Sequence, residues 1–297
     1  MKILLSGGTG FIGTLLIERL ISSGHQITIL SRQTLPDRGS CQYVRDLEDI
    51  SQDQPIDAII NLAGASMSGK RWSLQYKKEL VVSRVNTTRA LVQLCSRQNQ
   101  PPCVFLSASA IGFYGPHADE LLDENGCSTD CFSSDLCQQW EAEAISAGRH
   151  DVRVCLMRLG VVLGREGGAL VDMERPFKMG IANWMGAGEQ WLSWVHREDV
   201  IAAILFLLDR QDLSGPFNIT APESVTSRGF CAAMKRHYLT FVTLPIPAIL
   251  MRLILGEVAD ELLLSGQRVT PAKLAAAGFK FSYPTLDAAL ENIVNPE

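Results

Sequence analysis

Short apolar runs alternate with amphipathic stretches through the first half of the chain. The apolar runs are Lys2–Ser6, Gln26–Ser31, Tyr43–Arg45, Ile56–Leu62, Val104–Leu106 and Val152–Arg158. An unbroken run such as Ile56–Leu62 is typical of a strand covered on both faces, as in a parallel sheet. Helical spacing of apolar residues fills the gaps over Phe11–Ile21, Leu74–Gln98 and Ser134–Ala147. This alternation predicts an α/β fold with a doubly wound parallel sheet and right-handed crossovers.

The pattern loosens after residue 163 into glycine-rich loops, short helices and two short strands, Trp191–Val195 and Phe217–Thr220. We therefore expect a larger domain over residues 1–163 and a smaller C-terminal α/β lobe over residues 164–297, with some strands and helices of the lobe returning to the first domain. The lobe is expected to cover the carboxyl edge of the sheet, where open parallel sheets bind ligands.

A glycine-rich loop joins the first strand to the first helix, with the sequence Gly7-Gly8-Thr9-Gly10-Phe11-Ile12-Gly13. Glycines at this spacing let the backbone turn tightly and approach a pyrophosphate at the helix N-terminus. Because a second strand follows at the expected distance, the loop predicts a Rossmann-type dinucleotide site that includes Gly7, Thr9, Gly10, Phe11, Ile12 and Gly13. A merely structural turn is the alternative.

The end of the second strand indicates which dinucleotide is bound. An acidic residue there would bind the adenosine ribose hydroxyls and repel a 2′-phosphate, whereas this chain has Ser31 and Arg32. A hydroxyl and a guanidinium favour NADP(H) over NAD(H). The alternative is that Arg32 is only a solvated surface residue.

Composition removes several classes of partner. The formal net charge is −5 and the basic residues are scattered, so nucleic acid and anionic membranes are not expected. No apolar stretch approaches the roughly 20 residues of a membrane span. The 8 cysteines form no Cys-x-x-Cys pair or Cys/His cluster, so we expect no metal site and a reducing, cytoplasmic location.

Several further motifs resemble the extended short-chain dehydrogenase/reductase superfamily: Asn61-Leu62-Ala63-Gly64, Ser107-Ala108-Ser109 and Tyr114-Gly115. The chain is most similar to an atypical branch, the YfcH-like (SulA-like) epimerase family. That likeness runs through Arg71-Trp72, Ser83-Arg84, Thr88, Trp140-Glu141, Arg158 to Gly164, Trp194-Val195-His196, Gly215 to Asn218 and Ala277-Gly278-Phe279. The resemblance implies an NADP-binding extended Rossmann fold without a securely assigned substrate.

The superfamily's chemistry uses a Tyr as acid/base, a Lys four residues later and a Ser or Thr on the substrate oxygen. The expected pair would fall within Phe132–Gln138, which contains neither Tyr nor Lys. Two residues remain as catalytic candidates: Ser109 stands where the superfamily has its Ser or Thr, and Tyr114 lies in the following loop. Alternatively, Ser109 caps the strand end and Tyr114 packs under the cofactor.

Other positions follow from the same resemblance. Small residues at a strand end let a dinucleotide pass closely, so Leu62, Ala63 and Gly64 are assigned to the cofactor. Arg84 is assigned to the same site. It could meet an anionic substrate group there, or it could pin its helix to the fifth strand. Three residues match the wall of a substrate pocket, namely Arg158, Trp194 and His196. His196 has a structural role as its alternative.

Two functional hypotheses follow. The first is an NADP(H)-dependent oxidoreductase or epimerase that acts on a small polar substrate, supported by the glycine loop with Ser109 and Tyr114. The second is a non-catalytic NADP(H)-dependent binding or regulatory protein linked to cell division, supported by the missing Tyr and Lys. The expected partner is a small-molecule substrate, and a homodimer is compatible with the sequence.

Overall fold

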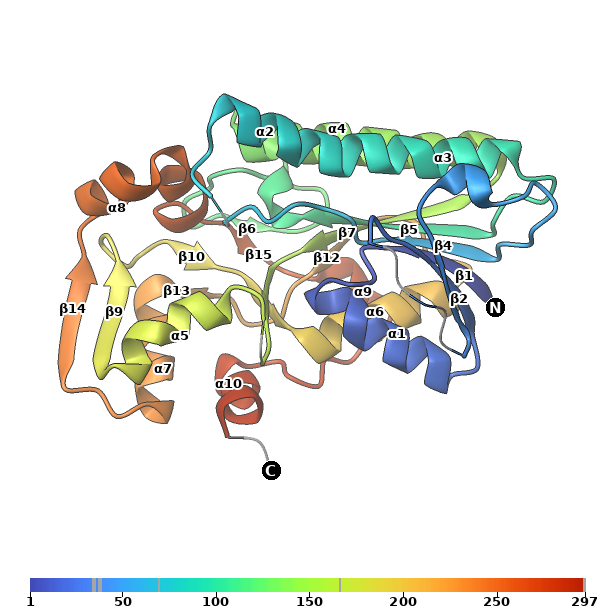
Figure 1. The fold of residues 1–297 in the computed structure, drawn as a ribbon. Helices are drawn as coiled ribbons and strands as arrows, with labels where there is room; N and C mark the ends of the chain where they lie inside the picture. The colour runs from blue at the N-terminus through green and yellow to red at the C-terminus, as the bar shows by residue number, and fades with distance from the viewer. Residues whose placement is uncertain (34–35, 37–38, 69, 166, 296–297) are drawn as a thin grey trace.

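The computed structural model describes residues 1–33, 36, 39–68, 70–165 and 167–295. Its centre is a seven-stranded parallel sheet with the order β12-β7-β5-β4-β1-β2-β3 (Figure 1). The strands are β1 (Lys2–Ser6), β2 (Gln26–Leu30), β3 (Cys41–Val44), β4 (Ala58–Asn61), β5 (Val104–Ala110), β7 (Arg153–Leu159) and β12 (Gly215–Ile219). Strand order reverses between β1 and β4, which is where doubly wound sheets open a ligand crevice. The predicted α/β fold with a Rossmann-type sheet is confirmed.

Helices cover both faces of the sheet. One face carries the long layer at the top of Figure 1, formed by α2 (Leu74–Val81), α3 (Thr87–Arg97) and α4 (Phe132–Ile145). The other face carries α1 (Phe11–Ser22), α6 (Arg197–Asp209) and the short α9 (Ala272–Ala276). Connections include the turns Leu47–Asp49, Ile111–Phe113 and Ser146–His150.

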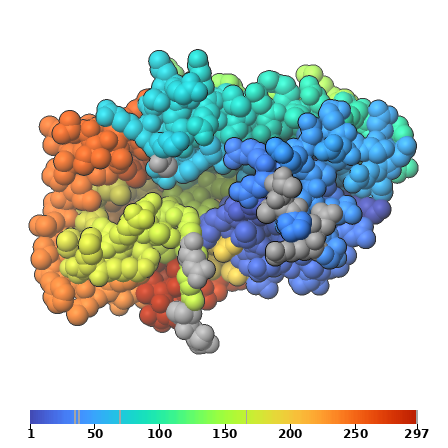
Figure 2. All heavy atoms as spheres, viewed as in Figure 1, coloured from blue at the N-terminus to red at the C-terminus, as the bar shows by residue number. Residues whose placement is uncertain are grey.

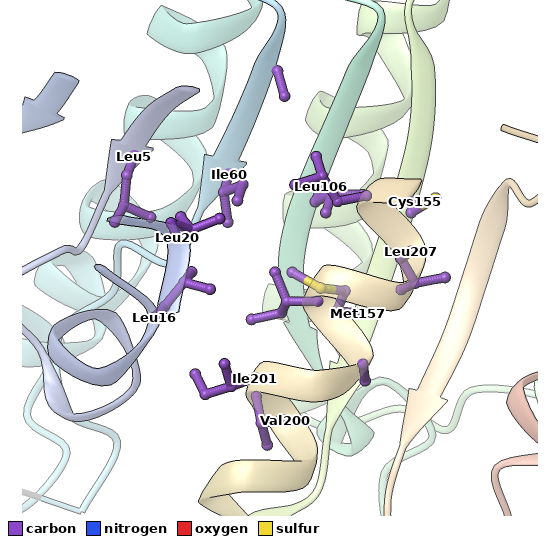
Figure 3. Packing of buried hydrophobic residues seen from close by; sticks show 14 of the residues in the cluster. Leu5, Leu16, Leu20, Ile60, Leu106, Cys155, Met157, Val200, Ile201 and Leu207 are labelled. Carbon is purple, nitrogen blue, oxygen red and sulfur yellow. The ribbon is translucent and has the colours of Figure 1, made fainter. Parts of the chain in front are cut away.

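The main core lies between the sheet and the α1–α6 layer. Figure 3 shows α1 and α6 directing apolar side chains onto β1, β4, β5 and β7, and the side chains labelled there are all buried: Leu5, Leu16, Leu20, Ile60, Leu106, Cys155, Met157, Val200, Ile201 and Leu207. Burial of each large aliphatic side chain contributes about 1.5–3 kcal/mol. This core fixes the carboxyl ends of β1, β4 and β5, from which the glycine loop and the neighbouring loops leave.

The C-terminal lobe is built from short paired strands and helices. The pairs are β6 (Leu121–Leu122) with β15 (Arg268–Val269), β8 (Val161–Leu163) with β11 (Trp194–His196), β9 (Ile181–Met185) with β14 (Val242–Ile246), and β10 (Trp191–Leu192) with β13 (Val225–Thr226). The helices are α5 (Leu170–Lys178), α7 (Ser227–His237), α8 (Ala248–Leu255) and α10 (Leu286–Val294), with a π-helical turn at Ala259–Leu263. After residue 164 the chain also supplies β12, α6 and α9 to the first domain; a boundary at residue 163 stays a prediction.

Three predicted elements differ from the structure. The single helix expected over Leu74–Gln98 is interrupted by a π-helical segment, Val82–Asn86, that contains Arg84. Strand β5 continues to Ala110, because its small polar residues are buried and find partners inside the protein. The strand expected over Trp191–Val195 divides at Ser193, whose hydroxyl donates to the carbonyl of Gln267 at 2.8 Å.

None of the helices in the described part of the chain could cross a membrane.

Candidate functional site

The glycine loop is shaped by close backbone contacts. Gly7 has φ +75°, a conformation that L side chains rarely adopt, and a Cβ on it would lie 2.5 Å from the carbonyl oxygen of Leu62. A Cβ on Gly13 would lie 2.3 Å from the carbonyl oxygen of Gly7 and 2.7 Å from Cα of Gly8. These two glycines therefore hold β1, the loop and the start of α1 together.

The N-terminus of α1 suits a phosphate group. Its N-cap residue, Gly10, offers no side-chain hydrogen bond, and the first turn contains no acidic residue. Among the described residues no protein acceptor contacts the amides of Phe11, Ile12 or Gly13. Unclaimed N–H groups and the positive end of the helix dipole attract an anion. A dinucleotide pyrophosphate therefore fits this end of α1.

Phe11 joins this loop to the C-terminal lobe. A Cβ on Gly167 would lie 2.3 Å from its ring, and a Cβ on Gly168 would lie 2.8 Å from it. The Arg197 guanidinium stacks on the ring at 4.5 Å and donates to the hydroxyl of Thr14 at 2.8 Å. The glycines after β8, which the sequence interpretation gave no role, let the lobe approach the cofactor loop.

Ser31 and Arg32 directly follow β2, which ends at Leu30, one residue before the predicted end. The hydroxyl of Ser31 is buried and accepts the amide of Gln33 at 3.1 Å. The side chain of Arg32 is exposed. The guanidinium is thus available to a phosphate at this edge.

The end of β4 is tied to its neighbours by the buried Asn61. Its Oδ1 accepts the Ser6 hydroxyl at 2.6 Å and the Ala63 amide at 3.3 Å, and its Nδ2 donates to Thr88 at 2.8 Å. Leu62 lies against Gly7, so the Leu62-Ala63-Gly64 segment runs directly beside the glycine loop.

Arg84 lies beneath the same segment. It donates to the carbonyls of Ala65 at 2.8 Å and Leu80 at 3.3 Å, and a Cβ on Gly64 would lie 3.1 Å from Cζ of Arg84. Burial lowers the pKa of Arg84, and no described carboxylate pairs with it. These contacts pin the loop after β4 to the helix layer, whereas the sequence alternative placed such a pin at the fifth strand. They also place a poorly compensated positive charge next to the cofactor crevice.

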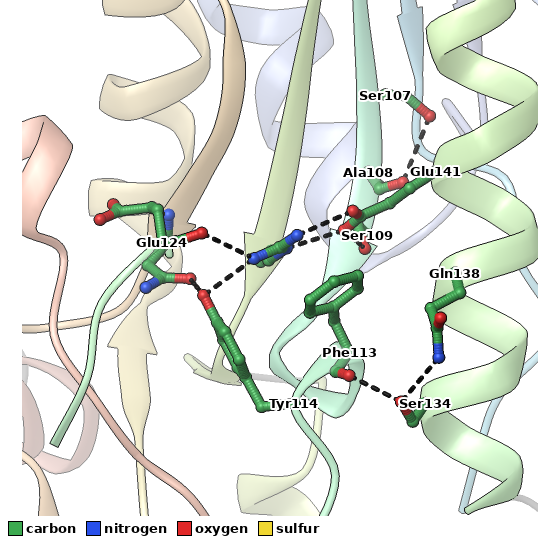
Figure 4. Close-up of polar contacts among 11 residues, drawn as sticks. Ser107, Ala108, Ser109, Phe113, Tyr114, Glu124, Ser134, Gln138 and Glu141 are labelled. Carbon is green, nitrogen blue, oxygen red and sulfur yellow. Dashed lines mark hydrogen bonds and ion pairs between the residues drawn. The ribbon is translucent and has the colours of Figure 1, made fainter. Parts of the chain in front are cut away.

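The catalytic candidates Ser109 and Tyr114 belong to a buried polar network (Figure 4). Arg158 makes a bidentate ion pair with Glu141, with nitrogen–oxygen distances of 2.8 and 2.9 Å. Ser109 donates to the same carboxylate at 2.7 Å. The Tyr114 hydroxyl accepts from Arg158 at 3.0 Å and donates to Asn218 at 2.7 Å.

Burial of this network is nearly complete. Exposed fractions are 0% for Tyr114, 2% for Ser109, 4% for Arg158 and 5% for Glu141. Burial also raises the pKa of Tyr114. These contacts give Ser109 and Tyr114 partners that neither sequence alternative named, and the catalytic role of both residues and the substrate role of Arg158 stay predictions.

Trp194 and His196 are also interior residues. Trp194 is 0% exposed in the core of the C-terminal lobe. His196 caps α6 by accepting the amide of Glu198 on Nδ1 at 3.1 Å, and its ring lies 3.9 Å from that of Tyr283. The structural alternative for His196 fits this position, and the substrate role of both residues stays a prediction.

The buried His196 makes the stability of the folded protein depend on pH. Burial lowers its pKa from the usual 6.5 to about 4. Between these values the unfolded chain binds a proton that the folded chain does not, so stability falls as the pH drops from 6.5 towards 4. His196→Asn keeps a capping acceptor but has no group that titrates in this range. Between pH 7 and pH 4.5 we expect its free energy of unfolding to fall by about 2 kcal/mol less than that of wild type, as measured by urea unfolding. A stability difference between the two proteins that does not change with pH would contradict this origin.

The stretch that lacks the Tyr and Lys, Phe132–Gln138, forms the start of α4. The Glu261 carboxylate accepts the amides of Phe132 at 3.1 Å and Ser133 at 2.8 Å, and the Ser133 hydroxyl at 2.5 Å. A carboxylate at a helix N-terminus is electrostatically favourable. The C-terminal lobe is therefore anchored on the helix that carries Glu141.

A hollow in the surface lies between the two parts of the molecule. Figure 2 shows it between the blue-to-cyan atoms of the N-terminal domain and the yellow-green atoms of α5. The loops that follow β1 and β4 border it in Figure 1. The cofactor loop, Leu62-Ala63-Gly64 and the glycines after β8 thus share one crevice. The described residues contain no group of three or more His, Cys, Asp and Glu side chains arranged to hold a metal.

Comparison with known proteins assigns the family. A family model described as the NAD dependent epimerase/dehydratase family matches residues 3–220, and a domain of unknown function, DUF1731, matches residues 246–293. The chain belongs to the NAD-dependent epimerase/dehydratase family. Among family members, the epimerase family protein SAR0825 of Staphylococcus aureus is 38% identical over 301 residues, with 98% of each chain covered.

Solved structures agree with this assignment. The human epimerase family protein SDR39U1, crystallised with NADPH, is 32% identical with a TM-score of 0.88 and full coverage of both chains. The nucleoside-diphosphate sugar epimerase of Corynebacterium glutamicum is 26% identical with a TM-score of 0.79, covering 100% of this chain and 59% of that one.

Several residues of this epimerase-family site escaped the sequence interpretation. Glu141 and Asn218 appeared only within motifs. Glu261 and Glu124, whose carboxylate accepts the amide of Asn218 at 3.1 Å, were given no role. One signal was available: Arg158 follows the apolar run Val154–Met157, and a cation in a buried strand requires a carboxylate partner. Which acidic residue supplies it is fixed only by the fold.

Proposed function

We propose that this chain binds NADP(H) and acts as an oxidoreductase or epimerase-like enzyme on a small polar substrate. The unclaimed amides at the N-terminus of α1, in a glycine loop that adjoins the carboxyl end of β4, carry this proposal. A relative that was crystallised with NADPH supports it. The second, regulatory hypothesis rests on the missing Tyr and Lys alone, and the family assignment does not favour it, so we do not propose it.

Each part of the crevice has a distinct task in this proposal. The amides of Phe11, Ile12 and Gly13 would hold the pyrophosphate, and Arg32 would pair with the 2′-phosphate. Arg84 would offset negative charge beside Gly64. The bound nicotinamide would exchange a hydride with the substrate.

The proposed roles of Ser109 and Tyr114 follow from their contacts. The hydroxyl of Ser109 is committed to Glu141, and that of Tyr114 is both a donor and an acceptor within the protein. We propose that they position β5 and the following loop in place of the acid/base role expected from the sequence. Arg158, Trp194 and His196 would likewise support the crevice from within.

Arg32→Asp tests the cofactor assignment. We expect NADPH to bind about 10- to 100-fold more weakly, since a charge-assisted contact is lost and a repulsive charge is gained. NADH binding should change less than about threefold, because NADH lacks the 2′-phosphate. Quenching of tryptophan emission during titration measures both.

Arg149→Asp is the matched control, because Arg149 is an exposed arginine near the start of β7, away from the glycine loop. It should leave both affinities unchanged. If Arg32→Asp loses affinity for NADPH and NADH equally, or loses no affinity for either, the assignment of Arg32 is overturned. Failure of wild type to bind either dinucleotide would overturn the proposed function.

Two finer assignments belong to the same proposal. The YfcH-like placement rests on motifs that span nearly the whole chain. A reducing, cytoplasmic compartment is supported by the eight cysteines, which are all free thiols.

A further inference from the structure

The outer rim of the C-terminal lobe exposes an unusual amount of apolar surface. Eight bulky side chains within residues 239–254 are between 45% and 79% exposed: Leu239, Phe241, Val242, Leu244, Ile249, Leu250, Leu253 and Ile254. We call this set the rim patch, and it lies along the orange margin at the left of Figures 1 and 2. It offers on the order of 800 Å², whereas the largest apolar patch of a typical monomer is about 300–600 Å².

Strand β14 is an open edge within the rim patch. Among the described residues it pairs with β9 only, and its first four residues are exposed. Parallel strands are normally covered on both faces. Pro245 of β14 lacks an N–H group, which blunts the edge against pairing with a further strand. An occupant of this edge is therefore held by side chains rather than by a ladder of backbone hydrogen bonds.

Helix α8 continues the rim patch with one apolar face. Ile249 and Leu253 lie one turn apart, as do Leu250 and Ile254, so these four exposed residues share a face of the helix. Met251 is buried on the inner side. A helix that carries an apolar face of leucine and isoleucine on its outer side is suited to lie in a membrane interface.

Basic side chains stand at both ends of the rim patch. At the start of β14, Nζ of Lys235 lies 3.2 Å from the hydroxyl of Thr243. At the end of α8, a Cβ on Gly256 would lie 2.8 Å from Nε of Arg71, and Lys70 precedes that arginine. All three basic side chains are exposed, and no described carboxylate forms an ion pair with any of them.

The carboxylates nearest in sequence do not neutralise these cations. Residues 235–260 contain two carboxylates, Glu257 and Asp260. Glu257 pairs with Lys77 at 2.6 Å, and Asp260 pairs with Arg252 at 2.7 Å. Both carboxylates are thus committed to other cations, and the unpaired basic side chains leave positive charge at the margins of the rim patch.

We propose that the rim patch docks this protein on an anionic membrane surface. In such contacts apolar side chains enter the headgroup region while cations beside them meet anionic lipids. A protein partner fits less well, because interfaces of standard size carry about ten hydrogen bonds and the side chains of the rim patch have no donors or acceptors. Basic residues are scattered in the sequence, which therefore predicted no anionic membrane partner, but the fold brings Lys70, Arg71 and Lys235 to the margins of one apolar surface.

Co-sedimentation of the full-length chain with lipid vesicles tests the docking. We expect binding to phosphatidylcholine vesicles with about 30% phosphatidylglycerol to be at least about tenfold stronger than to phosphatidylcholine alone. Leu253→Asp should weaken binding to the anionic vesicles at least about tenfold, because an apolar anchor is lost and a like charge is gained. Ile145→Asp is the matched control, since Ile145 is 57% exposed at the end of α4, outside the rim patch, and should bind as wild type does.

Reversal of two marginal charges tests the electrostatic part. The double variant Arg71→Glu with Lys235→Glu should bind the anionic vesicles about 10- to 100-fold more weakly, and its binding to phosphatidylcholine alone should not change. Arg149→Glu is the control, because Arg149 is an exposed arginine outside the rim patch. Added salt should weaken binding of wild type to the anionic vesicles, since it screens the attraction.

Four outcomes would overturn the proposal. The first three are a wild type that binds neither kind of vesicle at about 1 mM lipid, equal binding to both kinds, and binding that persists in both Leu253→Asp and Phe241→Asp. The fourth comes from sedimentation velocity without lipid, where a wild-type dimer that Leu253→Asp dissociates would assign the rim patch to a second copy. Circular dichroism of each variant shows whether the fold is retained.

Discussion

Glu141→Gln is expected to lower the free energy of unfolding by about 3–5 kcal/mol. The substitution keeps the shape of the side chain but leaves Arg158, which is 4% exposed, without a counter-charge. Burial opposes the charged form of Arg158, and the hydrogen bonds and charge of Glu141 more than offset it, so that the net effect is a raised pKa. Ser109 also loses a charged acceptor. Urea unfolding followed by circular dichroism measures the change.

Asp287→Asn supplies the control for this prediction. It breaks the ion pair between Arg236 and Asp287, whose side chains are 56% and 60% exposed. Exposed pairs contribute at most about 1 kcal/mol. If Glu141→Gln lowers the free energy of unfolding no more than Asp287→Asn does, the buried pair does not stabilise the fold as we argue.

Gly13→Ala is expected to weaken NADPH binding by about 100-fold or more, which corresponds to about 2.7 kcal/mol. The added methyl group would lie 2.3 Å from a backbone oxygen of the glycine loop, so the loop has to move. The first-turn amides of α1 would then no longer converge on a pyrophosphate. Fluorescence titration with NADPH measures the loss.

Gly148→Ala is the matched change, because a Cβ there meets no atom within 4 Å. It should bind NADPH as wild type does. Wild-type affinity in Gly13→Ala would show that the loop tolerates the displacement and that close packing at Gly13 is not what shapes the site.

The sequence predicted the elements that are determined by residues close together in the chain. Apolar runs identify buried strands because both faces of a parallel strand are covered, and the glycine loop is recognisable because its backbone requires particular residues at fixed spacing. The π-helical interruption at Val82–Asn86 was missed, since apolar periodicity over Leu74–Gln98 continues through it.

Contacts between distant segments could not be predicted in this way. Tyr114 meets Asn218 across 104 positions, and Ser133 meets Glu261 across 128. A polar residue in a buried stretch of sequence shows only that a hydrogen-bond partner is needed, and the fold decides which residue is that partner. The sequence therefore offered Ser109 and Tyr114 as catalytic candidates or structural residues without naming their partners, which the structure supplies.

The contact between Phe11 and the glycines after β8 couples dinucleotide binding to the packing of the C-terminal lobe against the glycine loop. Phe11 contributes its amide to the first turn of α1 and its ring to the seat of the C-terminal lobe. A dinucleotide that fixes the backbone of this residue also fixes the surface on which Gly167 and Gly168 rest. If the bound dinucleotide raises the affinity of a ligand that contacts the lobe, thermodynamic reciprocity requires that ligand to raise the affinity of the dinucleotide by the same factor. Phe11 therefore links the affinity for the dinucleotide to the position of the C-terminal lobe.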